Sequence, residues 1–300
     1  MIRPSSRASG FVQRTILTED GGRITARMFG DTAGARGGVV IVPAMGVAQA
    51  YYGALADWLA GQGWLVLTFD YRGIGLSHTG SLRGVEIDIV DWARFDCAAA
   101  VEELATHLPR KPIVWVGHSL GGQIIPFVPN RDRIAKFITI ATGSGYWREN
   151  TTALRSRVWL LWFVLVPLLV PLFGYFPGRR LGIVGDLPAG VIRQWRRWCL
   201  NPQYALGAEG EEVRGSYAAV TTPIVSLSFT DDEIMSARST RSLHDFYASA
   251  PRTAIRISPG DVGLQRIGHF GFFRSEVADP LWHGWLLPEL DLAVRFTHPT

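Results

Sequence analysis

The chain has 300 residues, of which 47% are hydrophobic and 19% are charged. A chain of this size and composition can bury a large core, which argues against disorder and favours one large domain or a domain with an insertion. Two cysteines far apart, Cys97 and Cys199, exclude a disulfide framework and favour a reducing, cytoplasmic location. The first ten residues carry no apolar run of the length that a secretory signal requires, so no signal is expected.

Short apolar strands alternate with helical patterns along most of the chain. The segments 12–17 and 23–29 flank the turn Asp20-Gly21-Gly22, which predicts an opening hairpin. Further strands are expected at 38–42, 64–69, 112–116, 136–140, 223–229 and 253–257, and helices at 51–60, at 85–108, after Ser119 and at 280–296. Because apolar strands separated by helices are typical of parallel sheets, we expect an α/β fold with a mostly parallel eight-stranded sheet covered on both faces.

This alternation breaks between the sixth and seventh expected strands. The chain there becomes rich in tryptophan, arginine and proline, which indicates an insertion. We therefore predict a core formed by 1–142 and 218–300, and a helical cap, or lid, formed by 143–217.

The predicted cap has an unusual distribution of charge and apolar residues. Its segment 158–176 has nineteen residues without a charge and contains Pro167 and Pro171. A lid over an apolar pocket is the main interpretation, a lid that dips into a membrane interface is the second, and a membrane span, which the prolines would kink, is the third. Eight arginines against two acidic residues lie between Arg148 and Arg197, which favours a membrane surface or an anionic substrate over nucleic acid.

A candidate nucleophile lies in Gly117-His118-Ser119-Leu120-Gly121-Gly122, directly after the expected strand 112–116. This order places Ser119 at a sharp turn between a buried strand and a helix, where an attacking hydroxyl is exposed. Glycines are needed two positions either side because side chains there would collide, and the helix directs N–H groups at the reacting carbonyl. Since a G-x-S-x-G pattern is a weak signal, the strand and helix around it carry this interpretation.

A serine hydroxyl becomes a good nucleophile only when a base accepts its proton and a third group orients that base. After such an elbow, the acid is expected behind the seventh strand and the histidine behind the eighth. Thr230-Asp231-Asp232-Glu233-Ile234 and Gly268-His269-Phe270-Gly271 occupy these two places. We therefore predict Ser119 as the nucleophile, His269 as the base and Asp232 as the orienting acid.

Asp232 is preferred over Asp231 because the apolar pair Ile234 and Met235 can anchor its loop in the core. The alternative role for either carboxylate is the N-cap of a helix at 236–250. His118 is expected to pack beneath the turn rather than to act as the base.

The tetrahedral intermediate of acyl transfer needs two N–H donors for its negative oxygen. The residue after the nucleophile, Leu120, supplies one of them. The other is expected from the loop Pro43-Ala44-Met45-Gly46 behind the third strand, with the backbone of Met45 preferred. The alternative for this loop is a simple turn.

Three segments carry a resemblance to a known family. Residues 70–77, Asp70-Tyr71-Arg72-Gly73-Ile74-Gly75-Leu76-Ser77, resemble the D-x-R-G-x-G-x-S loop of the α/β-hydrolases, and 117–122 resemble their nucleophile elbow. With 268–274, these segments are similar to bacterial hydrolases near the serine aminopeptidase and monoacylglycerol lipase-like branch. The loop Pro43-Ala44-Met45-Gly46 departs from the His-Gly found in many members, which leaves the second oxyanion donor open.

These features predict a serine hydrolase of the carboxylesterase or lipase type, acting on an ester, thioester or amide with an apolar acyl group. An acyltransferase that uses the same triad and a non-catalytic member that binds a ligand are the alternatives. A serine at position 119 argues against dehalogenases and epoxide hydrolases of this fold, which place a carboxylate there. No metal, cofactor or nucleic acid is expected, and peripheral membrane contact through the cap is a further expectation.

Overall fold

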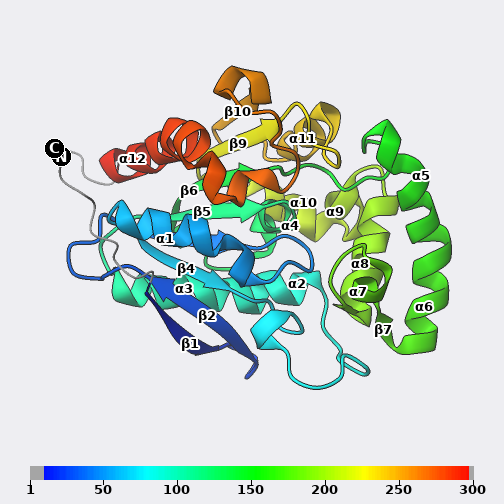
Figure 1. The fold of residues 1–300 in the computed structure, drawn as a ribbon. Helices are drawn as coiled ribbons and strands as arrows, with labels where there is room; N and C mark the ends of the chain where they lie inside the picture. The colour runs from blue at the N-terminus through cyan, green and yellow to red at the C-terminus, as the bar shows by residue number, and fades with distance from the viewer. Residues whose placement is uncertain (1–9, 297–300) are drawn as a thin grey trace.

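A computed structural model describes residues 10–296, and the N-terminal stretch used above against a secretory signal lies almost entirely outside them. An eight-stranded sheet with the order β1-β2-β4-β3-β5-β6-β9-β10 forms the centre of the molecule (Figure 1). The hairpin strands pair antiparallel with each other and β2 with β4, and the other neighbours are parallel. The strands are β1 Phe11–Leu17, β2 Arg23–Phe29, β3 Gly38–Val42, β4 Leu65–Phe69, β5 Ile113–His118, β6 Ile134–Ile140, β9 Ile224–Phe229 and β10 Arg252–Ile257.

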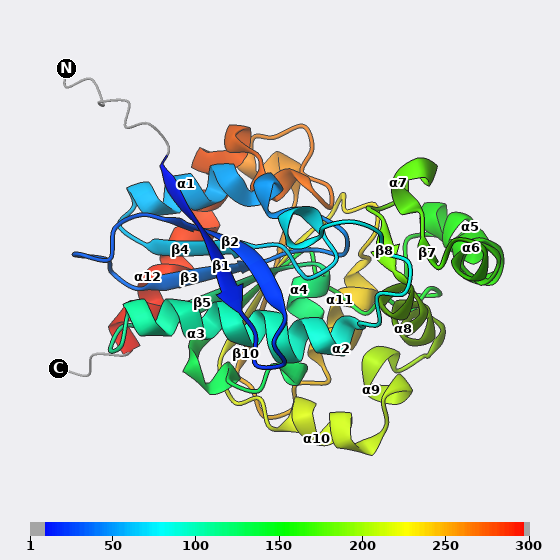
Figure 2. The ribbon, with the colours of Figure 1, turned by 90° about the horizontal axis from the view of Figure 1, so that it is seen from below.

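Helices cover both faces of this sheet, because successive side chains of its buried strands alternate between two cores. Val39 and Ile41 of β3 face a core shared with α1 (Gly53–Gly61) and the C-terminal helix, which combines 278–286 with α12 (Leu287–Phe296). Val40 and Val42 face the opposite core, which includes α3 (Ala98–His107). Figure 2 shows α1 and α3 on opposite sides of the strands, as the sequence predicts.

The strands lie within two residues of their expected bounds, whereas three helices are shorter than predicted. The expected helix 85–108 begins at Ile89 with α2 (Ile89–Asp91) and continues through 92–97 into α3. It starts there because Asp88 accepts the backbone N–H of Asp91, whose side chain accepts the N–H of Asp88. This reciprocal cap fixes the first turn.

The helix after Ser119 is much shorter than the sequence suggests. It is α4, which spans only Leu120–Gln123 before the chain turns at Ile124. Two glycines weaken it, and Pro126 has no N–H with which to continue an α-helix. The helix is therefore a single turn, too short to carry the dipole of a long helix.

The segment between β6 and β9 forms helices and a two-stranded sheet at one end of the molecule (Figure 1). Its role as a separate cap remains a prediction. Its elements are α5 Thr152–Leu160, α6 Val166–Phe173, β7 Tyr175–Phe176, α7 Gly178–Leu181, β8 Leu187–Pro188, α8 Ala189–Leu200, α9 Tyr204–Ala208 and α10 Glu211–Ala218. The core helix α11 (Ala237–His244) follows β9 and ends six residues before the expected bound at 250.

The two prolines of the apolar segment lie within helix rather than breaking it. Residues 152–173 form one helix, called here the α5–α6 helix, with a π-type turn at Leu161–Leu165. Pro167 follows that turn, and Pro171 lies inside α6. A π-type turn directly before a residue without an N–H accommodates the missing i→i−4 hydrogen bond.

Candidate active site

Ser119 lies between β5 and α4 in a backbone conformation that residues other than glycine rarely adopt, with φ 50° and ψ −109°. Two hydrogen bonds hold this conformation. The Ser119 N–H donates to the carbonyl of Ile140 at 3.0 Å, and the Thr142 hydroxyl donates to the Ser119 carbonyl at 3.2 Å. Strained backbone persists only where the surroundings fix it, and such residues cluster at active sites.

The glycines around the serine are required by close approach of backbone. A Cβ on Gly117 would lie 2.5 Å from the carbonyl oxygen of Gly121, and a Cβ on Gly121 would lie 2.2 Å from that of Val42. Both distances are shorter than real Cβ contacts. The prediction that glycines are needed two positions either side of Ser119 is therefore confirmed.

The predicted acid and base form a buried pair. His269 Nδ1 lies 3.0 and 3.1 Å from the two carboxylate oxygens of Asp232, and the residues are 2% and 5% exposed. The carboxylate also accepts the backbone N–H groups of Ile234 and Met235, each at 2.8 Å. Asp232 is thus fixed by its own loop and holds one ring nitrogen, which is the arrangement of an orienting acid.

Asp231 has a different role from either that the sequence suggests. Its carboxylate accepts the N–H groups of Ile267 and Gly268, at 2.8 and 3.1 Å, and so holds the loop that carries His269. The N-cap of α11 is Ser236, whose hydroxyl oxygen accepts the N–H of Ser239. The alternative of a helix cap at position 231 or 232 is therefore wrong, because Ser236 lies directly at the helix start.

His118 packs beneath the turn, as predicted, and connects the elbow to the loops that carry His269 and Ala44. Its Nε2–H donates to the carbonyl of His269 at 3.1 Å, and its Nδ1 accepts the Tyr52 hydroxyl at 3.0 Å. The same hydroxyl accepts the N–H of Ala44 at 2.9 Å. Burial, with a smaller effect of His269, holds the pKa of His118 well below its usual value, so the ring is neutral. A carbonyl can only accept, which assigns the single proton to Nε2.

Sequence reasoning missed Tyr52, because nothing local to Tyr51-Tyr52 shows that a hydroxyl there reaches the elbow.

The D-x-R-G-x-G-x-S loop, residues 70–77, has a structural role. Asp70 accepts the N–H groups of Gln49, at 2.6 Å, and Leu76, at 2.9 Å. Through Asp70, this loop therefore holds Gln49, four residues after Met45, in place.

The expected oxyanion donors remain predictions with suitable surroundings. Within residues 10–296, the N–H groups of Met45 and Leu120 have no protein acceptor, whereas the N–H of Ala44 is occupied by Tyr52. Met45 and Leu120 both line a cavity with Ser119.

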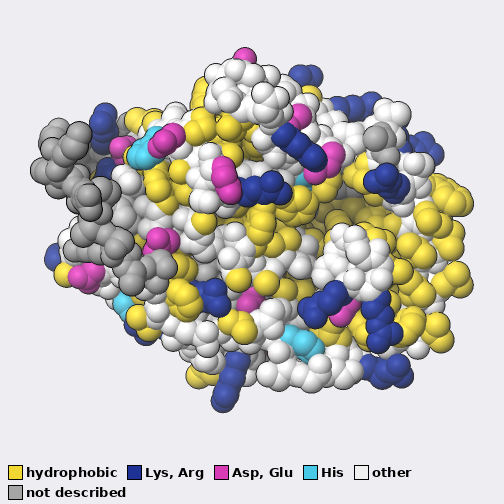
Figure 3. Space-filling model, in the orientation of Figure 1, with side chains coloured by type: hydrophobic (Ala, Val, Ile, Leu, Met, Phe, Trp, Pro, Cys, Tyr) yellow, Lys and Arg dark blue, Asp and Glu magenta, His cyan; other side chains and the backbone are white. Residues whose placement is uncertain are grey.

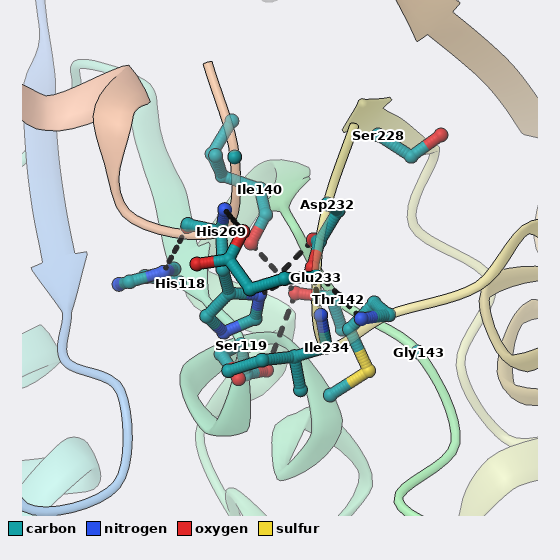
Figure 4. Close-up of polar contacts among 12 residues, drawn as sticks. His118, Ser119, Ile140, Thr142, Gly143, Ser228, Asp232, Glu233, Ile234 and His269 are labelled. Carbon is teal, nitrogen blue, oxygen red and sulfur yellow. Dashed lines mark hydrogen bonds and ion pairs between the residues drawn. The ribbon is translucent and has the colours of Figure 1, made fainter. Parts of the chain in front are cut away.

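That cavity has a volume of about 190 Å³ and lies between the core and the insertion. Ser119 and His269 line it from the core. Figure 4 shows the imidazole of His269 between Asp232 and Ser119. The Ser119 hydroxyl has no hydrogen-bond partner among the described residues; such bonds often tighten only around a substrate. The insertion contributes an almost wholly apolar wall of Gly145, Asn150, Leu154, Val158, Leu161, Trp162, Ile183, Val184, Trp195 and Cys199.

Asn150 is the polar exception on that wall, and no motif in the sequence indicates it. Its side chain is buried, yet its amide has no hydrogen-bond partner in the described part of the chain. Among the same residues, no group of three or more His, Cys, Asp or Glu side chains is placed to hold a metal ion.

Comparison with known proteins supports the fold. The model of the serine aminopeptidase S33 family of hydrolases matches residues 33–171, and no curated protein matches the sequence significantly. Similar solved structures include a Pyrococcus furiosus esterase, with 15% identity, a TM-score of 0.61 and coverage of 95% of this chain and 91% of that one. A membrane phospholipase A has 15% identity, a TM-score of 0.59 and coverage of 95% and 87%. An N-acyl homoserine lactone degrading enzyme has 16% identity, a TM-score of 0.56 and coverage of 91% and 100%.

These likenesses extend over nearly the whole chain, and they agree with the strand order and with the strained serine elbow described above. The chain therefore has the α/β-hydrolase fold, as the three motifs of its sequence predict.

Proposed function

We propose that this protein is a serine hydrolase that cleaves an ester, thioester or amide with an apolar acyl group through an acyl-serine intermediate. The observation that carries the proposal is that Ser119 and His269 line one cavity, while Asp232 holds the other ring nitrogen of that histidine. Because the similar structures include an esterase and a phospholipase A, the proposal favours carboxylic esters, as cleaved by carboxylesterases and lipases.

In the proposed first step, Ser119 Oγ attacks the carbonyl carbon while His269 Nε2 accepts the hydroxyl proton. The N–H groups of Met45 and Leu120 stabilise the negative oxygen of the tetrahedral intermediate. Its collapse breaks the bond to the leaving alcohol, which takes the proton from His269 and leaves the acyl group on Ser119. A water molecule, deprotonated by His269, then attacks the acyl carbon, and release of the acid restores the serine.

The insertion acts in this proposal as a lid whose inner wall binds the acyl chain. The wall is apolar, so each buried methylene group contributes about 0.8 kcal/mol to binding. Asn150 supplies a hydrogen bond to a polar atom of the substrate, because its amide lines the cavity and has no partner among the described residues. The substrate class is thus an acyl ester with an apolar chain and a polar group near the reacting carbonyl.

A fluorophosphonate probe tests the activated serine, with the Ser119→Ala protein as the control. The proposal predicts covalent labelling of the wild type and none of the variant. A folded wild type that does not label would favour the non-catalytic alternative. Product analysis with added alcohols separates the remaining alternative, because an acyltransferase would form new esters in preference to free acid.

A further inference from the structure

The α5–α6 helix is apolar on two opposite faces. Its inner face packs on the protein, where Leu161, Trp162, Val166 and Val170 are buried. Its outer face exposes Trp159, Leu160, Phe163, Leu168 and Leu172. A helix on the surface of a soluble domain normally places polar side chains on its outer face, so this face lacks its partner in the isolated chain.

The exposed apolar side chains are concentrated in this part of the molecule. Seven of the twelve large hydrophobic residues exposed within 10–296 lie between positions 159 and 183. Apolar patches of this kind mark interaction sites. Figure 3 shows the hydrophobic surface at this end, with basic side chains along its border. We call it the outer patch, which consists of Trp159, Leu160, Phe163, Leu168 and Leu172.

Arginines flank the outer patch on both sides along the chain. Before Trp159 in the chain lie Arg148 and, within α5, Arg155 and Arg157. After Leu172 lie Arg179 and Arg180 of α7. All five are exposed, and none forms an ion pair with another described residue. An apolar face bordered by unpaired cations is complementary to a lipid surface with apolar chains and anionic headgroups.

We propose that the outer patch docks on the surface of a bilayer that contains anionic phospholipid. The helix is long and apolar enough to span a membrane, since an 18-residue window within Leu154–Phe173 has a mean hydropathy of 1.9. A span would, however, remove Leu161 and Trp162 from the core and take away a wall of the cavity. The helix therefore lies along the interface and stays packed on the protein.

Docking in this orientation has a consequence for the cavity. The inner face of the docked helix lines the cavity beside Ser119, so the cavity would lie close to the acyl chains of the lipid. The docking itself does not rest on the proposed hydrolase activity. A Ser119→Ala protein is therefore expected to dock as the wild type does, which keeps the two proposals separable.

Partitioning onto vesicles tests the proposal, using the full-length Ser119→Ala protein so that no lipid is cleaved. The vesicles consist of phosphatidylcholine alone or of phosphatidylcholine with phosphatidylglycerol, at low and high salt. We expect binding to both, stronger binding to the anionic vesicles, and loss of that preference at high salt.

Leu168→Ser/Leu172→Ser tests the apolar part. These leucines are 64% and 68% exposed, so their loss should leave the fold intact and weaken vesicle binding about tenfold or more. The matched control is Val12→Ser/Leu17→Ser on the hairpin, at 60% and 66% exposure, which should bind like the parent.

Arg179→Gln/Arg180→Gln tests the charge. Two arginines near an anionic surface strengthen binding by up to about 30-fold, so this variant should lose most of the anionic preference and keep its binding to neutral vesicles. Arg23→Gln/Arg110→Gln removes two exposed arginines outside the patch and should change nothing.

Equal binding of the parent to neutral and anionic vesicles at low salt would overturn the proposal, as would unchanged binding of the leucine variant. A dimer in solution that Leu168→Ser/Leu172→Ser dissociates would show that a second copy, rather than lipid, covers the patch. Circular dichroism and the melting temperature confirm that each variant is folded.

Discussion

The two sides of the cavity are built by different physical means. On the core side, hydrogen bonds fix each group: Asp232 through two backbone N–H groups, His269 through Asp232, and the elbow through Ser119 N–H. On the side of the insertion, the wall consists almost entirely of apolar side chains held by packing. We therefore expect activity to depend on single polar atoms on the core side and on side-chain volume on the side of the insertion.

The largest expected effect is on the core side, at the nucleophile. Ser119→Ala removes one oxygen and should lower kcat by about 10⁴ or more, because the acyl-serine can no longer form. Steady-state hydrolysis of a chromogenic ester measures this. A folded variant that keeps the full rate would end the assignment.

The next largest effect distinguishes the roles of the adjacent carboxylates Asp231 and Asp232. Asp232→Asn should cost orders of magnitude in kcat, because an amide cannot hold His269 in the required tautomer. Asp231→Asn should change kcat little, since one carbonyl oxygen can still accept the N–H groups of Ile267 and Gly268. A larger loss at position 231 would reverse the assignment.

Tyr52→Phe tests whether the hydrogen-bonded loops position the site. The loss of the hydroxyl leaves the Ala44 N–H and His118 Nδ1 unpaired, which should cost about 1–3 kcal/mol of stability. We expect kcat to fall while KM stays nearly constant. Tyr217→Phe is the control, because that buried hydroxyl has no partner among the described residues, and it should change neither quantity.

On the side of the insertion, added volume should act on substrate choice alone. Val158 lines the cavity, so Val158→Phe should shift the preferred acyl chain to shorter lengths and lower kcat/KM for decanoyl esters. Each methylene group that no longer fits costs about 0.8 kcal/mol, or about fourfold. The control Leu160→Phe adds an aromatic ring on the exposed outer face and should leave the chain-length profile unchanged. A profile that falls from acetyl to decanoyl esters in the wild type would contradict the acyl wall.

The smallest effect lies in the core, away from the cavity. Burial holds the pKa of His244 below its usual value, between the Thr240 carbonyl and the Thr139 hydroxyl. The stabilisation of the neutral ring is present above the unfolded pKa and is lost as the pH falls below it. Compared with His244→Gln, the wild type should lose more stability as the pH falls below about 6.5, by at most about 1.4 kcal/mol per pH unit. Denaturant unfolding between pH 7 and 5 tests this, and parallel curves would contradict it.

The sequence predicted most of the core because its signals are local. The strands follow apolar runs, and the elbow and the two strand-end loops place Ser119, Asp232 and His269 without reference to distant residues. It did not predict Tyr52 or Asn150, whose importance depends on contacts across 66 residues for Tyr52 and His118, and across the cavity for Asn150. It also did not predict that the α5–α6 helix passes through two prolines, because the π-type turn there depends on packing.

The central claim is that Ser119 carries the acyl group while the wall of the insertion binds the chain. Mass spectrometry of protein quenched with acid during turnover of a decanoyl ester tests it most directly. We expect a decanoyl adduct on the peptide that contains Ser119, and no such adduct in the Ser119→Ala protein. Turnover by the wild type without any adduct, or an adduct on another residue, would contradict it.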